Sequence, residues 1–415
     1  MRRGLAWPGS LLGVAVVSLA LMAVAATSSP QIPPTLVTPQ SWRVTHDVAG
    51  EHSRGPTADA AWLSEGTVPG RGTRWEAMVR MALLDVHQLS APDGAVAAGA
   101  GGRWNYAWPR DSAFVAVALA RTGHHGDALR MLTFLQRVQL RDGGFEARYL
   151  LDGSAPPDDR DRQSDGAGWA LWAESEVSRS VGVVGPPAAL RPLLDGATAF
   201  ALAVTDGGRR LPPASPDYWE VGVRQTSLGT VAPLLAGLQA SQRMYAALGE
   251  PELASRSGSA AARLSAIVEE RFAGRYERFG SGWFRGGGLD AAVTFLMLPF
   301  VESPSAPSAE LVGAWTRYQS DALRPAGGLA PGSQWKQDGI SWTPETALVA
   351  YTAAANRRPE IAGHWMDWLS AHRTPWGSLP EKVRADGAPA GPAPLAWTAS
   401  LVILTAAQLE TSNAH

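Results

Sequence analysis

The chain has 415 residues, 45% of them hydrophobic, and a formal net charge of -2. This much apolar material is enough for a large core and excludes wholesale disorder, while the length allows one large closed architecture or two domains. The chain has 36 basic and 38 acidic side chains, so it lacks the excess positive charge that binds a polyanion. We therefore expect no nucleic-acid partner. The 17 tryptophans fit a sugar-stacking cleft, because an indole offers both a flat apolar face and an N–H donor.

The first 25 residues have the pattern of an export signal. Arg2 and Arg3 precede an apolar stretch over 11–24, and small residues at 23–25 form a plausible cleavage site. The stretch is short for a membrane span of about 20 residues. We therefore expect a secreted, extracytoplasmic protein, with an N-terminal membrane anchor as the alternative if the segment stays uncleaved. The chain has no cysteine, which excludes disulfides and thiolate metal sites.

Residues 26–70 are rich in Pro, Ser, Thr and Gly, which is typical of a linker or an extended arm. From residue 71 to 412, apolar residues recur at the spacing of three and four that predicts amphipathic helices. Twelve such segments follow one another, at 72–89, 112–122, 125–140, 166–181, 187–204, 226–248, 250–272, 290–301, 308–320, 342–355, 359–371 and 395–410. Strand-like alternation is scarce, so the sequence predicts an all-α domain.

Short and long connections alternate along these segments. Short turns follow the even-numbered segments, as at 121–126 and 356–359. Long loops rich in Trp, Gly, Asp and Glu precede them, at 99–111, 141–166, 205–225, 272–289, 324–341 and 374–395. Six helical hairpins with every long loop on one side predict a closed double ring of helices. The long loops would rim one cavity at the N-terminal ends of the inner helices, where the helix dipoles are positive.

Two glutamates on different long loops are candidate catalytic residues. Glu220 follows Trp219 in the third loop, and Glu381 lies in the sixth. Two carboxyl groups across a sugar cleft can hydrolyse a glycosidic bond, one protonating the leaving oxygen and the other activating water or attacking carbon. The ring of Trp219 would raise the pKa of Glu220 and keep it protonated. The alternative is that both glutamates are solvated residues near helix starts.

The first long loop ends in Trp108, Pro109, Arg110 and Asp111. Pro109 biases Trp108 away from helical angles, and Asp111 suits the start of a helix. This loop would deliver Arg110 and Asp111 to the cavity, unless it is only a helix cap with core tryptophans and a surface ion pair.

Two further groups of polar residues have simpler interpretations. We expect Glu345 to be an acidic residue in the first turn of a helix that starts near Pro344. We expect His124 and His125 to lie in a surface turn rather than at a metal. No metal or cofactor is therefore expected.

Four elements, in this order along the chain, carry a family resemblance: Trp108-Pro109-Arg110-Asp111, Gln163-x-Asp165-Gly166, Trp219-Glu220, and Leu379-Pro380-Glu381 with Pro394-Leu395-Ala396-Trp397. Together they resemble glycoside hydrolase family 15, which contains glucoamylases, glucodextranases and some bacterial trehalases. The resemblance covers residues 75–410 and implies an (α/α)6 barrel with an inverting mechanism and no metal. It implies Glu220 as general acid and Glu381 as general base. It also implies a substrate-binding set around the terminal glucose: Trp104, Trp108, Arg110, Asp111, Gln163, Asp165, Trp219 and Trp397.

One departure from the family concerns the substrate. Family members usually place a substrate-binding arginine in the fifth loop, but residues 327–341 contain none, and Lys336 could replace it only as a point charge. The expected activity is exo-acting release of glucose from the non-reducing ends of soluble oligosaccharides. Trehalose hydrolysis and a non-catalytic sugar-binding barrel are the alternatives.

Overall fold

Eleven of the twelve predicted helical segments form α-helices in the computed structural model. The structure describes residues 56–156, 158–183, 185–280, 286–302 and 307–413, which all belong to one compact unit over 34–415. These eleven α-helices are α3 (Glu76–Leu89), α4 (Pro109–Arg121), α5 (His125–Val138), α6 (Asp165–Val181), α7 (Arg191–Val204), α8 (Leu228–Ala247), α9 (Pro251–Phe272), α10 (Ala309–Asp321), α11 (Thr343–Ala355), α12 (Pro359–Ala371) and α13 (Ala396–Asn413). The periodic spacing of apolar residues therefore located each of them to within a few residues.

The segment predicted over 290–301 is the exception. It forms only the 3-10 helix η3 (Ala291–Leu296), which Asp290 caps by accepting a hydrogen bond from the Ala292 N–H at 2.8 Å. Pro299 lies inside the predicted span, and a proline disfavours helical angles at the residue before it. Two further 3-10 turns, η1 (Gly102–Trp104) and η2 (Ala188–Leu190), lie in loops.

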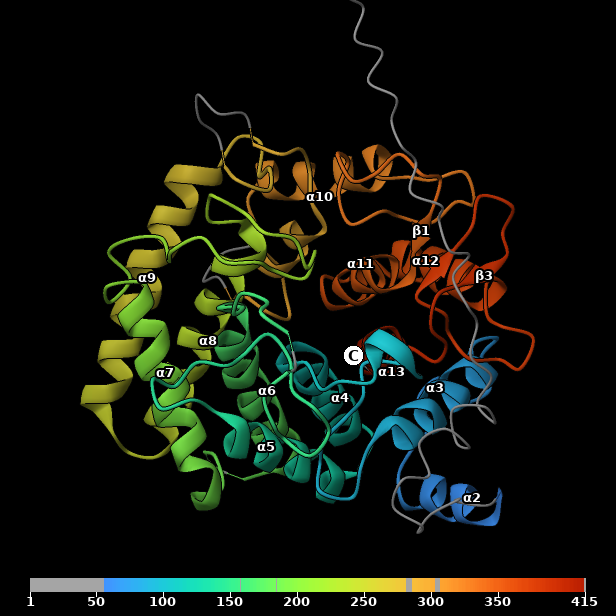
Figure 1. The fold of residues 1–415 in the computed structure, drawn as a ribbon, viewed down its shortest axis with the longest axis horizontal. Coiled ribbons are helices and arrows are strands. Elements are labelled where there is room, and N and C mark those ends of the chain that lie inside the picture. The colour runs from blue at the N-terminus through green and yellow to red at the C-terminus, as the bar shows by residue number, and fades with distance from the viewer. Residues whose placement is uncertain (1–55, 157, 184, 281–285, 303–306, 414–415) are drawn as a thin grey trace, which may run out of the picture. The chain divides into compact units, whose positions relative to one another are not determined.

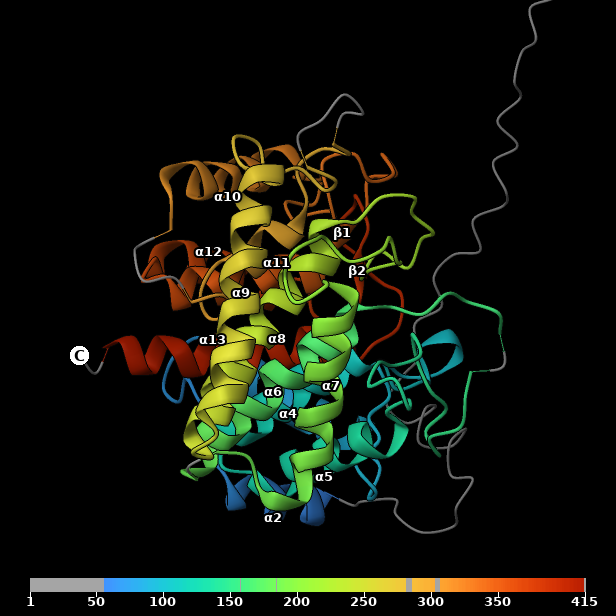
Figure 2. The ribbon, with the colours of Figure 1, turned by 90° about the vertical axis from the view of Figure 1, so that its left-hand side faces the viewer.

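The helices form two concentric rings, which Figure 1 shows nearly end-on and Figure 2 from the side. The inner ring runs α4, α6, α8, η3, α11 and α13, each in contact with the next, and closes where α13 contacts α4. The outer ring consists of α3, α5, α7, α9, α10 and α12. This arrangement confirms the predicted (α/α)6 barrel of six helical hairpins.

Inner and outer helices differ in how they are buried. The inner α4 is buried from Pro109 to Ala120, whereas the outer α5 buries one face and exposes the other. A helix that is enclosed on all sides is apolar all round, and one at the surface is amphipathic. The inner helices also approach closely: a side chain on Gly168 of α6 would meet the Pro233 carbonyl oxygen of α8 at 2.2 Å. A glycine is required there for the ring to close.

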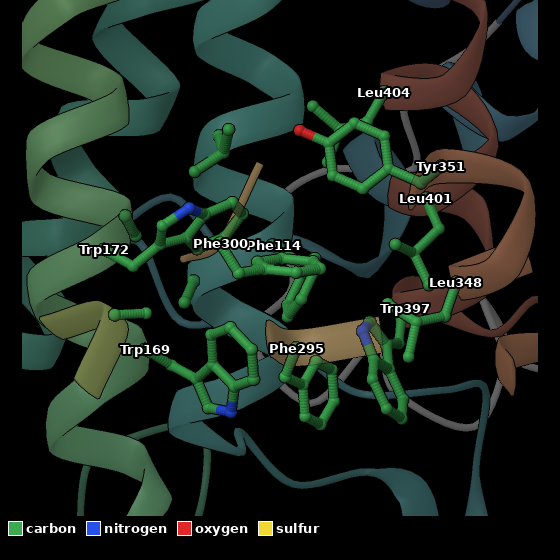
Figure 3. Packing of buried hydrophobic residues seen from close by; sticks show 14 of the residues in the cluster. Phe114, Trp169, Trp172, Phe295, Phe300, Leu348, Tyr351, Trp397, Leu401 and Leu404 are labelled. Carbon is green, nitrogen blue, oxygen red and sulfur yellow. The ribbon is translucent and has the colours of Figure 1, made fainter. Parts of the chain in front are cut away.

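The centre of the barrel is packed with aromatic side chains (Figure 3). Phe114, Trp169, Trp172 and Phe300 contact one another with ring centroids 4.9–5.8 Å apart. Trp397 lies at the edge of this cluster, with its ring 5.8 Å from that of Phe114. The middle of the barrel is therefore a filled core rather than a channel.

Helix α2 (Pro56–Glu65) lies in the segment that we interpreted as a linker or arm. Its Trp62 is stacked between His87 and His124, with ring centroids 3.9 and 3.8 Å away. The Trp62 Nε1–H also donates to Asp127 at 2.8 Å. The last part of the predicted arm is thus a helix docked on the barrel. The predicted signal peptide, residues 1–25, lies outside the described residues. Within residues 56–413, where the placement is described, no helix has the length and apolar character needed to cross a bilayer.

A small antiparallel sheet joins the fifth and sixth long loops. Its strands are β1 (Ser341–Trp342), β2 (Lys382–Val383) and β3 (Pro389–Ala390), with Trp342 opposite Lys382. The Thr343 N–H also donates to the Glu381 carbonyl oxygen at 3.0 Å. The sheet therefore holds Glu381 beside the start of α11.

Candidate functional site

One cavity opens at the end of the barrel where the inner helices begin. It is lined by Ala98, Trp104, Trp108, Arg110, Asp111, Tyr218, Glu220, Trp342, Pro344, Glu345, Glu381, Leu395 and Trp397. These residues come from the first, third, fifth and sixth long loops and from the first turns of α4, α11 and α13. The structure thus brings together seven of the predicted site residues in one place. The other three, Gln163, Asp165 and Trp219, do not line the cavity.

A larger hollow of about 630 Å³ lies between α7 and α9, away from the long loops. Its arginines are engaged at the surface: Arg191 pairs with Asp195 and Glu250, and Arg263 donates to the Gly207 carbonyl oxygen. The smaller cavity is the better candidate because carboxyl, guanidinium and indole groups converge on it.

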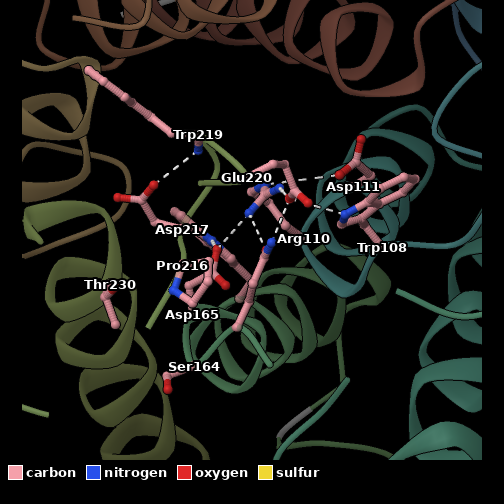
Figure 4. Close-up of polar contacts among 12 residues, drawn as sticks. Trp108, Arg110, Asp111, Ser164, Asp165, Pro216, Asp217, Trp219, Glu220 and Thr230 are labelled. Atoms are coloured by element: carbon pink, nitrogen blue, oxygen red, sulfur yellow. Dashed lines mark hydrogen bonds and ion pairs between the residues drawn. The ribbon is translucent and has the colours of Figure 1, made fainter. Parts of the chain in front are cut away.

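Glu220 accepts hydrogen bonds on both carboxylate oxygens (Figure 4). Oε1 accepts from Trp108 Nε1 at 3.1 Å, from Gln163 Nε2 at 2.5 Å and from Arg110 at 3.3 Å. Oε2 accepts from Arg160 at 2.9 Å. All four partners are donors, and two of them are guanidinium groups. A proton carried on Oε2 would share that oxygen with Arg160 alone, and Arg160 is the most exposed of the four donors.

The backbone at Glu220 is unusual. Its φ is 56°, a left-handed conformation that costs a non-glycine residue roughly 1–3 kcal/mol. The buried Asp217 holds this turn, because its carbonyl oxygen accepts from the Glu220 N–H at 2.9 Å and its carboxylate accepts from the Trp219 N–H at 3.0 Å. Such strained residues persist where the surroundings fix them, and they cluster at functional sites.

The ring of Trp219 points away from Glu220 (Figure 4). It packs under the guanidinium of Arg278 at 3.7 Å and edge-on to Trp335 at 4.7 Å. The predicted apolar wall against the Glu220 carboxyl group is therefore absent, because the turn at Glu220 sends neighbouring side chains in opposite directions.

Arg278 supports the site from outside the cavity, and the sequence pattern did not indicate it. It is 2% exposed and bridges two buried carboxylates, Asp217 at 2.6 Å and Asp290 at 2.8 Å. The Tyr218 hydroxyl also donates to Asp290. This cluster ties the third loop, which carries Glu220, to the fourth loop and to η3. Its three members lie on separate segments, and no local sequence signal links them.

Arg110 is buried behind Glu220 and forms one wall of the cavity. Its guanidinium contacts Asp165 at 2.8 Å and Gln163 at 3.1 Å and lies 5.3 Å from the Trp397 ring centroid. Burial alone would lower the pKa of Arg110, but the charges of Asp165, Asp111 and Glu220 outweigh it and raise the pKa. Gln163 and Asp165 therefore position Arg110 rather than face the cavity themselves.

Glu381 is 7% exposed, with a hydrogen-bond donor beside one carboxylate oxygen and a cation beside the other. Trp104 Nε1 donates to Oε1 at 3.2 Å, and the Lys382 ammonium lies 2.9 Å from Oε2. Burial raises the pKa of Glu381, and Lys382 and Trp104 partly offset that rise. A carboxylate with a raised pKa that keeps a positive neighbour is suited to act as a base near neutral pH.

Two further carboxyl groups line the cavity. Burial raises the pKa of Asp111 to about 6, although Arg110 lowers it in part. Burial raises the pKa of Glu345 to about 8, and its Oε2 has no hydrogen-bond partner. We expected Glu345 to be only a first-turn acid, but the structure places it in the cavity wall, since the first turn of α11 faces inward.

The described part of the chain contains no cluster of three or more His, Asp or Glu side chains placed to hold a metal ion. The expectation of a surface turn was wrong for His124, which is 5% exposed because Trp62 of α2 stacks on it, and burial lowers its pKa.

None of the family models and none of the curated proteins matches the chain. Solved structures do match it. A wild-type glycosidase is 21% identical with a TM-score of 0.68, and the match covers 80% of this chain and 96% of that one. The glucoamylase of Saccharomycopsis fibuligera is 14% identical with a TM-score of 0.67, over 81% and 95% of the two chains. The chain has the fold of the glucoamylases.

A bacterial glucoamylase in complex with acarbose also matches, at 16% identity and a TM-score of 0.65. This match covers 80% of the present chain but 55% of the bacterial one. These glucoamylase-like structures confirm the predicted resemblance at the level of the fold.

Proposed function

We propose that this chain is a glycoside hydrolase: a secreted, exo-acting, inverting α-glucosidase that releases glucose from the non-reducing ends of soluble oligosaccharides. One observation carries the proposal. Five buried polar atoms in the cavity wall lack a hydrogen-bond partner: Arg110 Nε, Trp342 Nε1, Glu345 Oε2, Glu381 Oε2 and Trp397 Nε1. Buried polar groups are normally satisfied, so this set of donors and acceptors fits a ligand with many hydroxyl groups, which is a sugar.

Glu220 and Glu381 are the proposed catalytic pair. Each receives an indole N–H from the first long loop, Trp108 for Glu220 and Trp104 for Glu381. Glu220 would protonate the leaving oxygen after Arg160 withdraws, and Glu381 would accept a proton from the attacking water. Arg110 and Asp111 would bind hydroxyl groups of the terminal glucose, with Trp397 under its ring. A glycosidase of the same fold has been solved in complex with glucose, which supports a saccharide as the ligand.

A cavity at the end of a filled barrel favours exo action, because only a chain end can enter it. The direct test is to incubate the protein with maltotriose, isomaltotriose and trehalose and to follow the anomeric protons by NMR. Release of β-glucose from maltotriose or isomaltotriose supports the proposal, and release from trehalose alone supports the trehalase alternative. Initial release of α-glucose from the non-reducing end of maltotriose or isomaltotriose would contradict inversion.

A non-catalytic sugar-binding barrel is the second candidate. Two observations favour it: four donors surround Glu220, and Arg110 is the one basic residue among the described residues that line the cavity. The substitutions Glu220→Gln and Glu381→Gln separate the two. In a hydrolase each should lower kcat by ~10²- to 10⁴-fold, whereas binding without turnover in the unsubstituted protein would support the second candidate.

A further inference from the structure

Glu345 is the one carboxyl group of the cavity that has neither a basic partner nor an indole donor in the described structure. Asp111 lies near Arg110, Glu220 contacts Arg110 and Arg160, and Glu381 contacts Lys382. Glu345 is 3% exposed, lines the cavity, and leaves its Oε2 unpartnered. A buried carboxyl group in that position is satisfied only by a proton or by a ligand.

The charges around Glu345 favour the protonated form. Glu381 and Asp290 repel a negative charge there, and Tyr318 of α10 would also repel it if ionised. Arg110 is the one nearby cation with an opposing effect, and it is already shared among three carboxylates. Together with burial these groups raise the pKa of Glu345 to about 8. The protonated form is therefore favoured near neutral pH, and no protein group forms a hydrogen bond with Glu345 Oε2.

A role in capping α11 does not account for this arrangement. The carboxyl group interacts with its own backbone N–H, which would favour the ionised form, yet burial outweighs this contribution. An exposed acidic residue would interact favourably with the helix dipole without the desolvation cost of a buried carboxyl group. Glu345 instead follows Pro344, which also lines the cavity, and it lies on the same rim as Trp342, whose own indole N–H is unpartnered.

We propose that Glu345 is a sugar-binding residue that determines specificity: its protonated carboxyl group donates a hydrogen bond to one hydroxyl oxygen of the saccharide in the cavity. The inference rests on the proposed function, because it takes a saccharide as the ligand. In this proposal the protonated Glu345 carboxyl group contacts the sugar in addition to Arg110 and Asp111. A sugar that lacks the contacted hydroxyl group should lose this interaction alone.

The test is binding of D-glucose to the full chain at pH 6 and pH 9, measured by calorimetry or NMR titration. Glu345→Gln keeps a donor of similar length, so its affinity at pH 6 should lie within about threefold of the unsubstituted protein, while Glu345→Met should lower it about tenfold. The unsubstituted protein should bind more weakly at pH 9 than at pH 6, and Glu345→Gln should lose most of that difference, the remainder arising from Asp111, whose pKa of about 6 also falls in this range.

Glu174 of α6 provides the matched control. It is also fully buried with both carboxylate oxygens unpartnered, and burial raises its pKa well above the usual range, but it does not line the cavity. Glu174→Gln and Glu174→Met should leave glucose affinity unchanged. Titration with 2-, 3-, 4- and 6-deoxyglucose should identify one analogue to which the unsubstituted protein and Glu345→Met bind equally.

The outcomes separate the two proposals. If glucose binds and Glu345→Met binds it as well as the unsubstituted protein, the role of Glu345 is overturned and the proposed function stands. If Glu345→Gln loses as much affinity for glucose as Glu345→Met, the proposal that residue 345 acts as a neutral hydrogen-bond donor is contradicted. If the unsubstituted protein binds no glucose at either pH, and hydrolyses none of the oligosaccharides, both proposals fail.

Discussion

Trp108 donates its indole N–H to Glu220 Oε1 across 3.1 Å, so an aromatic residue of the first long loop holds the candidate general acid on the third. We expect Trp108→Phe to lower kcat by ~10- to 100-fold, because a hydrogen bond to a charged group is worth about 1.5–3 kcal/mol. Steady-state kinetics on maltotriose measures this. Trp219→Phe is the control: its ring packs on Arg278 outside the cavity, so kcat should change less than twofold. A larger effect for Trp219→Phe would contradict the assignment.

Arg160 contacts Glu220 from the second long loop and also pairs with Asp158. If its withdrawal precedes proton transfer, Arg160→Ala should raise kcat at pH 7 several-fold, because one donor to the carboxylate is removed in advance. Initial rates over pH 5–8 measure this. Arg162→Ala is the matched control, since Arg162 is exposed and pairs with Asp142 and Glu146 instead. A loss of activity in Arg160→Ala would show that Arg160 assists turnover.

The buried cluster of Arg278, Asp217 and Asp290 should dominate the stability of the third loop. Arg278→Met leaves two buried carboxylates without their cation, and we expect it to lower the free energy of unfolding by about 3–5 kcal/mol. Arg275→Met removes a surface pair with Glu277 and should cost no more than about 1 kcal/mol. Urea unfolding followed by tryptophan fluorescence measures both. Equal effects would mean that the buried cluster contributes little.

Asp85 provides a test of pH dependence. It is 1% exposed, accepts from the Ser378 hydroxyl at 2.8 Å, and burial raises its pKa to about 8. Because the folded state binds the proton more tightly than the unfolded state, stability is greatest below pH about 4 for this group and falls as pH rises towards 8. Asp85→Asn removes this pH-dependent contribution to the stability of the folded state.

The melting temperature of Asp85→Asn should therefore lie close to that of the unsubstituted protein near pH 4 and exceed it at pH 8.5. Differential scanning calorimetry across this range measures the difference. Parallel curves for the two proteins would show that Asp85 titrates normally in the folded state.

Much of the fold follows from local properties of the chain. The spacing of apolar residues located eleven α-helices, and the alternation of short turns and long loops predicted which helices form the inner ring. Pro109 and Pro344 mark the starts of α4 and α11, because a proline is tolerated in the first turn of a helix and excluded from its interior. These signals act within a few residues, so a single sequence contains them.

The direction of individual side chains was decided only by the tertiary structure. Glu220 adopts a left-handed conformation that turns Trp219 away from it, and the buried Asp217–Arg278–Asp290 cluster that holds this loop comes from distant segments. From the sequence, Glu345 was predicted to be an ordinary acidic residue in the first turn of a helix. Closure of the helical ring buries it in the cavity wall. The burial of a side chain and the charges around it depend on neighbours that the whole fold brings together. The amino-acid sequence therefore predicts which residues can take part in chemistry. Tertiary packing decides which of them face the ligand.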